Sequence, residues 1–293
     1  MFSYFCLNIS LIFPIYIDSF LRGGYFFMKK DGHIHTPFCP HGSQDSLKLY
    51  IEKAISHGFS EITFTEHAPL PSGFIDPTPD QDSGMDAALL QPYFKQLNIL
   101  KKQYQKKIKV LIGLEVDYIS GFEEQTTQFL NEVGPYLDDA ILSVHFLKLD
   151  DEYHCIDFSH DVYLQFAEQI GSVQAMYDLY YETVRKSIVA DLGPFKPKRI
   201  GHPTLIHKFQ LAHTEQIDDS QTIKQLLLLM KERDYELDVN SAGLSKPMCK
   251  EPYPALPFIE FAKSIALPIV FGSDAHTAKD LHQHYDIIYP EIK

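Results

Sequence analysis

Side chains that can bind metal ions occur singly or in pairs at the ends of the predicted strands of this chain. There are seven histidines and two carboxylates: His33, His35, His41, His67, Glu115, His145, His202, Asp274 and His276. Imidazole and carboxylate bind zinc, iron and manganese at neutral pH, and this set exceeds what one ion can use. The pattern predicts a fold that gathers strand ends around a multinuclear metal site, as in a metal hydrolase.

Short apolar runs alternate with amphipathic stretches from Met28 onward. We expect strands at residues 30–35, 61–65, 108–116, 139–144, 199–201, 236–240 and 269–272. We expect helices at residues 46–57, with Ser43 or Asp45 as cap, and at 86–107, 122–133, 164–190, 221–233 and 257–264. Alternation repeated about seven times, with polar residues at the strand ends, is typical of an α/β barrel whose active site lies at its C-terminal face.

Residues 1–27 differ from the rest because they are apolar and aromatic. They lack a basic n-region and a small-residue cleavage site, and Pro14 and Asp18 interrupt them. The uninterrupted apolar stretch is shorter than the ~20 residues that a spanning helix needs. We interpret these residues as a doubtful leader from a misassigned start. We predict one cytoplasmic barrel domain over residues 28–293, with no membrane partner.

The charge balance argues against a nucleic-acid surface. The net charge is −13, and the chain has only four arginines, whereas phosphate-backbone binding relies on clustered basic residues. The four cysteines form no CxxC pair, so we expect reduced thiols, with Cys39 as a bystander in a loop. A phosphate substrate stays compatible with this charge if metal ions supply local positive charge.

Two segments are expected to form loops over the metal face. Residues 66–85 are rich in Pro, Gly and Asp and too long for an ordinary connection between strand and helix, which is typical of a lid. Residues 146–161 follow His145 in the same way and are expected to shape the substrate pocket.

Spacing separates the candidate ligands from ordinary histidines. On an extended strand the side chains of His33 and His35 point to the same side, so both can bind one ion. Asp274 and His276 repeat this arrangement, and Glu115 ends a strand too apolar to hold an unpartnered charge. The remaining histidines, of which His154 is the least certain, are expected to be structural or exposed: His57, His160, His207, His213, His282 and His284.

In this order, the motifs H-x-H, a third His six residues later, TEH, a Glu after a strand, SVH, GHP and SDAH resemble the polymerase and histidinol phosphatase (PHP) superfamily. The resemblance runs from about Met28 to beyond His276. DGHIHTPFCPHGS, FTEHAPLP, GLEVDY, ILSVHF and RIGHPTLI are similar to its bacterial histidinol-phosphatase branch. The resemblance implies a distorted (β/α)7 TIM-like barrel and a phosphoric monoester hydrolase of histidine biosynthesis. Its reaction would convert L-histidinol phosphate to L-histidinol and phosphate.

The resemblance also implies three divalent metal ions, with zinc, iron and manganese all open. His33, His35, Glu115 and Asp274 would bind the first ion, Glu115 with His145 and His202 the second, and His41, His67 and His276 the third. Two ions bridged by a carboxylate can hold a hydroxide between them, which would attack phosphorus in line.

Arg199 lies three residues before His202, so we predict that it contacts the phosphate in catalysis, with Arg185 as the second candidate. The alternative for either arginine is a surface ion pair. Asp274 or a metal-bound water is expected to protonate the leaving alkoxide. Acceptors and an aromatic wall for histidinol are offered by Asp76, Asp80, Asp82 and Phe74, among which the sequence does not choose.

Three other functions have to be compared with this one. A phosphoesterase of this superfamily acting on a nucleotide or a nucleic-acid end would need a basic groove, which this acidic chain lacks. An amidohydrolase-like barrel typically uses a ligating lysine, and no lysine ends any predicted strand. A non-catalytic regulatory module usually lacks ligands, and none is missing here. The small-molecule phosphate ester is the expected partner, and the oligomeric state stays open, with a homodimer among the options.

Overall fold

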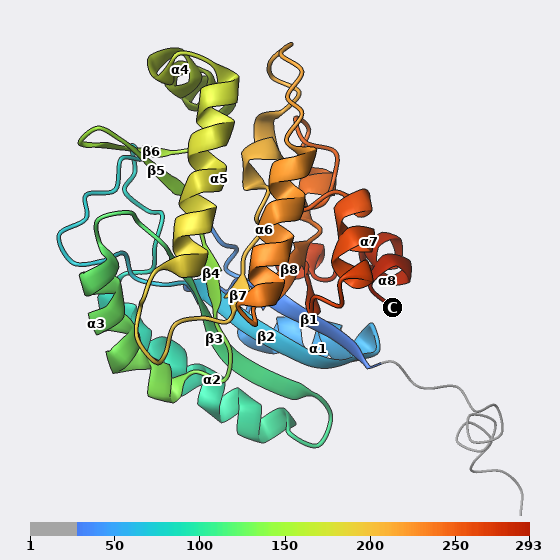
Figure 1. Ribbon diagram of the computed structural model, residues 1–293. Coiled ribbons are helices and arrows are strands. Elements are labelled where there is room, and N and C mark those ends of the chain that lie inside the picture. Colours follow the sequence, from blue (N-terminus) through green and yellow to red (C-terminus); the bar gives the residue numbers. More distant parts are fainter. Residues whose placement is uncertain (1–27) are drawn as a thin grey trace, which may run out of the picture.

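The computed structural model describes residues 28–293, which form a nearly closed barrel of parallel strands wrapped by helices (Figure 1). The predicted leader, residues 1–27, lies outside the described residues. One seven-stranded sheet has the order β1-β2-β3-β4-β7-β8-β9, and all its neighbouring strands run parallel. The bounds are β1 Lys29–Ile34, β2 Phe59–His67, β3 Lys109–Asp117, β4 Ile141–Ser143, β7 Arg199–Ile200, β8 Glu236–Asn240 and β9 Ile269–Gly272. The predicted (β/α)7 architecture is confirmed.

The first and last strands of the sheet meet just beyond their C-terminal ends. His35 N donates to Ala275 O at 3.1 Å, and Asp274 N donates to His33 O at 2.8 Å. This seam nearly closes the barrel. It also brings together two ligand-bearing segments that lie far apart in the sequence.

The helices form the outer layer of the barrel (Figure 1). They are α1 Leu47–Ser56, α2 Leu90–Tyr104, α3 Glu123–Val133, α4 His160–Ile170, α5 Val173–Val189, α6 Ser220–Glu232, α7 Leu256–Ser264 and α8 Tyr285–Ile292. In α1 the buried residues Leu47, Tyr50, Ile51 and Ala54 recur at helical spacing, so a single apolar face packs on the sheet. No helix in the described part of the chain is long and apolar enough to cross a membrane.

The prediction of one helix over residues 164–190 is wrong, because two helices occupy this region. Helix α4 ends at Gly171, whose φ of 106° lies in the left-handed region that glycine adopts most easily. Ser172 then caps α5, since its side chain accepts a hydrogen bond from Ala175 N. The Gly-Ser pair marks this boundary in the sequence.

Two smaller predictions also need correction. Ser46, not Ser43 or Asp45, caps α1, because the Ser46 hydroxyl accepts from Leu49 N at 3.3 Å. Residues 146–161, expected to be a loop, contain the antiparallel hairpin β5 Phe146–Leu149 and β6 Glu152–Cys155. Strands of four residues are too short for alternation to distinguish them from a loop. Helix α8 was not predicted.

Candidate metal centre

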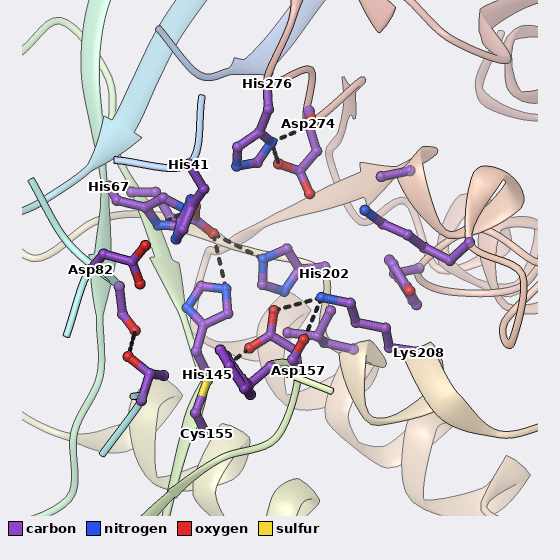
Figure 2. A pocket seen from close by; sticks show the side chains of 18 of the residues that line it. His41, His67, Asp82, His145, Cys155, Asp157, His202, Lys208, Asp274 and His276 are labelled. Atoms are coloured by element: carbon purple, nitrogen blue, oxygen red, sulfur yellow. Dashed lines mark hydrogen bonds and ion pairs between the residues drawn. The ribbon is translucent and has the colours of Figure 1, made fainter. Parts of the chain in front are cut away.

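Six of the seven barrel strands bring candidate ligands to one end of the barrel. Each of these residues lies within four positions of the last residue of its strand: His33 and His35 (β1), His67 (β2), Glu115 (β3), His145 (β4), His202 (β7), Asp274 and His276 (β9). Parallel strands place their carboxyl ends at the same edge of a sheet, so these side chains converge. Figure 2 shows this for His67, His145, His202, Asp274 and His276.

Glu115 is at the centre of this group and is almost fully buried. Its Oε2 lies 3.3 Å from His33 Nε2, 3.4 Å from His35 Nε2 and 3.3 Å from His67 Nδ1. Its Oε1 lies 2.9 Å from His202 Nε2 and faces the β4 side of the site. The two oxygens of one carboxylate therefore face two different sets of donors, as expected for a carboxylate that bridges metal ions.

Three groups of donor atoms in the described chain are compact enough to hold a metal ion. Within each group the donor atoms lie within 4.8 Å of one another. The groups are His33, His35 and Asp274; Glu115, His145 and His202; and His35, Cys39, His67 and His276. The structure thus brings together every predicted ligand except His41, which lies in the loop after β1 with its ring centroid 5.5 Å from that of His67.

Carboxylates behind the ligands fix the orientation of the imidazole rings. His33 Nδ1 lies 2.9 Å from an oxygen of Asp238, and His145 Nδ1 lies 2.7 Å from an oxygen of Asp117. Glu66 is 3.2 Å from His35 Nδ1 in the same way. Such partners select the tautomer that presents Nε2 to a metal ion.

The sequence analysis missed these orienting carboxylates. Two of them could have been identified from the sequence. The first is Glu66, which is the middle residue of the TEH motif. Asp117 is the second, because it follows Glu115 by two positions on the same side of β3.

Buried carboxylates raise the pKa of two imidazoles. Burial opposes the charged form of His33, but Asp238 and Glu115 raise the pKa of His33 to about 10. Burial also opposes charge on His145, yet Asp117 raises the pKa of His145 to about 10. Metal ligation requires neutral imidazole, so a metal cation would take the place of these protons among the same carboxylates.

The carboxylates of the site are stabilised as anions. Burial would raise the pKa of Glu115, but the nearby His33 and His67 hold it well below its usual range. The pKa of Asp274 is likewise well below its usual range, because His33 and His35 outweigh the effect of burial. His67 itself keeps a pKa well below its ordinary value, since it is buried and lies beside His35. A set of carboxylates and imidazoles of this kind fits divalent metal ions, which would displace the protons of His33 and His145.

Cys39 lies among the ligands, which the interpretation of a bystander thiol did not anticipate. Its Sγ is 3.0 Å from His41 Nδ1. Burial disfavours the thiolate, but hydrogen bonds from His276, His35 and His41 lower the pKa of Cys39 to about 4.

A cavity of about 590 Å³ opens above the donor groups (Figure 2). Both predicted loops line it, the first through Thr78, Asp80, Asp82 and Ser83 and the second through Phe146, Cys155, Asp157 and Phe158. Tyr253, Lys208 and Lys246 are also part of its wall. The cavity thus combines anionic, aromatic and cationic groups around the metal centre.

Lys208 is a cavity residue that the sequence analysis missed. It lies on the short 3-10 helix η3 Leu205–Phe209, and its Nζ donates to Asp157 O at 2.7 Å and to Asp157 Oδ2 at 2.9 Å. The only sequence signal is its place six residues after His202, in the turn that follows β7.

The two arginines expected at the phosphate do not line the cavity. Arg199 is buried at the N-terminal end of β7, where its Nη2 donates to Asp139 Oδ2 at 2.6 Å. Arg185 lies on the outer surface, where it pairs with Glu182 at 2.7 Å. Arg185 therefore makes the surface ion pair named as the alternative, whereas the ion pair of Arg199 is buried.

Only part of the set expected to bind histidinol faces the cavity. Asp80 and Asp82 line it. Asp76 is buried within the 66–85 loop, where it accepts hydrogen bonds from Thr78 N and Ser83 N, both at 2.9 Å. Phe74 packs against Phe146 and other aromatic rings beneath the loop.

Histidines expected to be structural lie outside the donor groups. His207 is buried between Asp219 and Glu251, at 2.7 and 2.6 Å. His282 contacts Asp31 at 2.8 Å and stacks on Phe59. His154 stacks on Phe166 and is not part of the cavity wall.

The sequence of this chain is similar to a known domain family and to two histidinol-phosphatases. The model of the PHP domain matches residues 31–242. The histidinol-phosphatase of Bacillus subtilis is 47% identical over 262 residues, which cover 88% of this chain and 97% of that protein. The histidinol-phosphatase of Lactococcus lactis is 28% identical over 259 residues, or 86% of each chain.

Solved structures share the barrel. A crystal structure from Listeria monocytogenes, provisionally assigned as a histidinol phosphatase, has a TM-score of 0.83 at 41% identity and covers 88% of this chain and 99% of its own. The histidinol phosphate phosphatase of Lactococcus lactis, solved with zinc, L-histidinol and phosphate, has a TM-score of 0.66 at 22% identity. The match covers 90% of this chain and 93% of that one. At this identity, the second likeness shows the shared fold alone.

Proposed function

This chain belongs to the PHP domain family, and we propose that it hydrolyses L-histidinol phosphate to L-histidinol and phosphate. The carrying observation is the buried Glu115 carboxylate, whose two oxygens face different sets of donors beneath a cavity. The histidinol-phosphatase of Bacillus subtilis, 47% identical over almost its whole length, supports the choice of substrate.

The donor groups support three divalent ions, with zinc, iron or manganese as candidates. His33, His35 and Asp274 would hold the first ion together with Glu115, whose Oε2 is 3.3 Å from His33 Nε2, and Glu115, His145 and His202 would hold the second. His67 and His276 would hold the third, to which only the family resemblance adds His41, since His41 lies outside the compact donor groups. Bound divalent ions would lower the pKa of a water molecule and stabilise negative charge on the phosphoryl group. The protein would contribute the fixed positions of these ligands, held by the carboxylates behind them.

Lys208 replaces Arg199 as our candidate for phosphate contact. A lysine ammonium has three donors, and two of them are used by Asp157. No described residue accepts a hydrogen bond from the third, so it can donate to a phosphate oxygen at the cavity wall, whereas Arg199 lies outside the cavity. The pair with Asp157 would hold the ammonium in place before substrate binds.

Histidinol carries an ammonium group and an imidazole, which need anionic acceptors and an aromatic surface. Asp80 and Asp82 offer carboxylates on the loop side of the cavity, and Phe146, Phe158 and Tyr253 offer aromatic rings. We propose that these residues, and not Asp76 or Phe74, contact the histidinol part of the substrate.

Asp274 is better suited to metal binding than to proton donation. Its pKa lies well below its usual range because of His33 and His35, so it carries no proton at neutral pH. Its Oδ1 lies 3.0 Å from His35 Nε2, and its Oδ2 accepts from Asn240 Nδ2 at 3.1 Å. We therefore assign Asp274 to the first ion only.

The test is phosphate release by the full chain from L-histidinol phosphate, compared with other phosphomonoesters and a single-stranded oligonucleotide, with and without chelator. We expect a strong preference for histidinol phosphate that chelation removes and added zinc or manganese restores. Chelator-sensitive release from the other substrates alone would contradict the substrate but keep the metal centre. No release from any substrate would contradict the enzyme and favour a metal-binding regulatory module.

A further inference from the structure

We propose that Cys39 is a ligand of the third ion, binding through its thiolate sulfur beside His67 and His276. This inference rests on the metal assignment of the proposed function and extends it, since the family resemblance implies only histidines at this position. It also gives the buried thiol a chemical role.

The geometry of the third donor group carries the proposal. The donor atoms of His35, Cys39, His67 and His276 all lie within 4.8 Å of one another. In a tetrahedral zinc site with bonds of about 2.0–2.3 Å, ligand atoms lie about 3.3–3.8 Å apart. Small side-chain movements therefore bring this group to ligand distances, whereas His41 is exposed and outside the group.

The backbone holds Cys39 in place at the start of this loop. Cys39 N donates to Thr36 O at 3.0 Å, and Gly42 N donates to Cys39 O at 3.1 Å. A Cβ at Gly42 would lie only 2.7 Å from Thr36 O, so this close turn needs glycine. Thr36 is itself fixed, because its N donates to Glu66 Oε2 at 2.8 Å.

A second observation points to the same position. His67 Nδ1 is buried and makes no hydrogen bond with the described residues, although it lies 3.3 Å from Glu115 Oε2, and the His67 ring centroid is 4.3 Å from that of His35. Buried polar atoms without a partner are rare, and a metal ion is one of the ligands that satisfies them. His67 belongs to the same donor group as Cys39.

The surroundings of Cys39 differ from those of the other described cysteines. The thiols of Cys155 and Cys249 donate to oxygen atoms, at 3.2 Å to Asp157 and at 3.5 Å to Glu251. Cys39 instead has imidazole nitrogen as its neighbour, at 3.0 Å from His41. Imidazole and thiolate are the ligand types that zinc combines in its tetrahedral sites.

A sulfur ligand has a consequence for metal choice. Thiolate is a soft donor that favours zinc over manganese, which prefers oxygen ligands. The third position would therefore select zinc more strongly than the two positions bridged by Glu115.

Cobalt substitution tests the proposal without relying on activity. The full chain is stripped with chelator, reloaded with Co²⁺, and examined for the near-ultraviolet charge-transfer absorption of a cobalt-thiolate bond. We expect the band in the native chain and in the matched control Cys155→Ser, whose thiol also lines the cavity. Cys39→Ser is expected to lose the band while keeping cobalt at the Glu115 positions.

A band that persists in folded Cys39→Ser, or a native chain that binds cobalt without the band, would overturn the proposal. In the second case chelator-sensitive turnover of histidinol phosphate would leave the proposed function intact. If Cys39→Ser does not fold, alkylation of the native chain decides, read by mass spectrometry of the Cys39 peptide. Labelling that zinc suppresses supports ligation, and labelling equal with and without zinc contradicts it.

Discussion

The two ends of this barrel hold similar charged side chains but use them differently. At the N-terminal end, carboxylates pair with lysine or arginine, as in Asp139 with Arg199 at 2.6 Å and Glu61 with Lys30 at 3.2 Å and Lys109 at 2.9 Å. At the C-terminal end, the single carboxylate of Glu115 faces several imidazoles, and no lysine or arginine contacts it. The comparison teaches that a carboxylate shared by several imidazoles, and not a buried charge as such, distinguishes a metal site from a structural ion pair.

The largest effect is expected from Glu115→Gln, which removes the charge shared by the donor groups. Turnover of histidinol phosphate should fall by at least about 10³-fold, equivalent to about 4 kcal/mol. The matched change at the other end, Glu61→Gln, should leave kcat within about twofold, since its partners are surface lysines. Steady-state kinetics with circular dichroism of both variants checks this. Near-native turnover in Glu115→Gln would break the comparison.

Arg199→Ala should act on stability. It leaves Asp139 without its buried partner, so the free energy of unfolding should fall by about 3–5 kcal/mol. The exposed pair of Arg185 with Glu182 is the control, and Arg185→Ala should cost below about 1 kcal/mol. Urea denaturation measures both. A variant of Arg199 that keeps its stability but raises KM would instead support the contact with phosphate expected from the sequence.

His207 shows how the protein satisfies clustered carboxylates with a proton instead of a metal ion. Burial opposes its charge, but hydrogen bonds to Asp219 and Glu251 raise the pKa of His207 to about 9, above the ordinary 6.5. Its stabilisation is therefore complete below about pH 6.5 and is lost as the pH rises towards 9, by about 3 kcal/mol at most. Unfolding free energies measured across this range should decline, and His207→Gln should flatten the decline. An equal slope in both proteins would assign it to another group.

The smallest effect is expected from Lys208→Met. Loss of one charge-assisted hydrogen bond to phosphate, worth about 2 kcal/mol, should lower kcat/KM about 30-fold. Lys101→Met is the control, because it breaks a similar pair with Asp138 at the opposite end and should leave kcat/KM unchanged. A loss in Lys208→Met that appears only in thermal stability would contradict the contact with phosphate.

The sequence was sufficient for the barrel and for the end at which its imidazoles and carboxylates gather, because both depend on local signals. Each strand is an apolar run, and the ligand types follow at its end. What the sequence analysis misjudged was how far along its strand a residue lies from the metal-binding end. Arg199 is three residues from His202 in the chain, but at about 3.3 Å per residue this separation carries it towards the other end of the barrel. The short distance between Arg199 and His202 in the sequence therefore did not place Arg199 near the metal-binding end of the barrel.

Other features depended on contacts between distant segments. Asp238, which orients His33, lies on β8, 205 residues later in the chain. Only the folded barrel shows that these two side chains are in contact. Lys208 enters the cavity through a 3-10 turn whose position is set by tertiary contacts, including Tyr163 Oη to Ile206 O at 3.2 Å. No periodicity marks either residue, because each acts singly.

The seam between β1 and β9 has a consequence for the order in which the protein is made. The ribosome releases the N-terminal part first, so His33 and His35 emerge long before Asp274 and His276. Until then the first and third donor groups lack members, and the hydrogen bonds that join β1 to the end of β9 cannot form. If the donor groups bind metal ions as proposed, the nascent chain can complete these groups only after residue 276 has left the ribosome, so we expect full metal binding to follow complete synthesis.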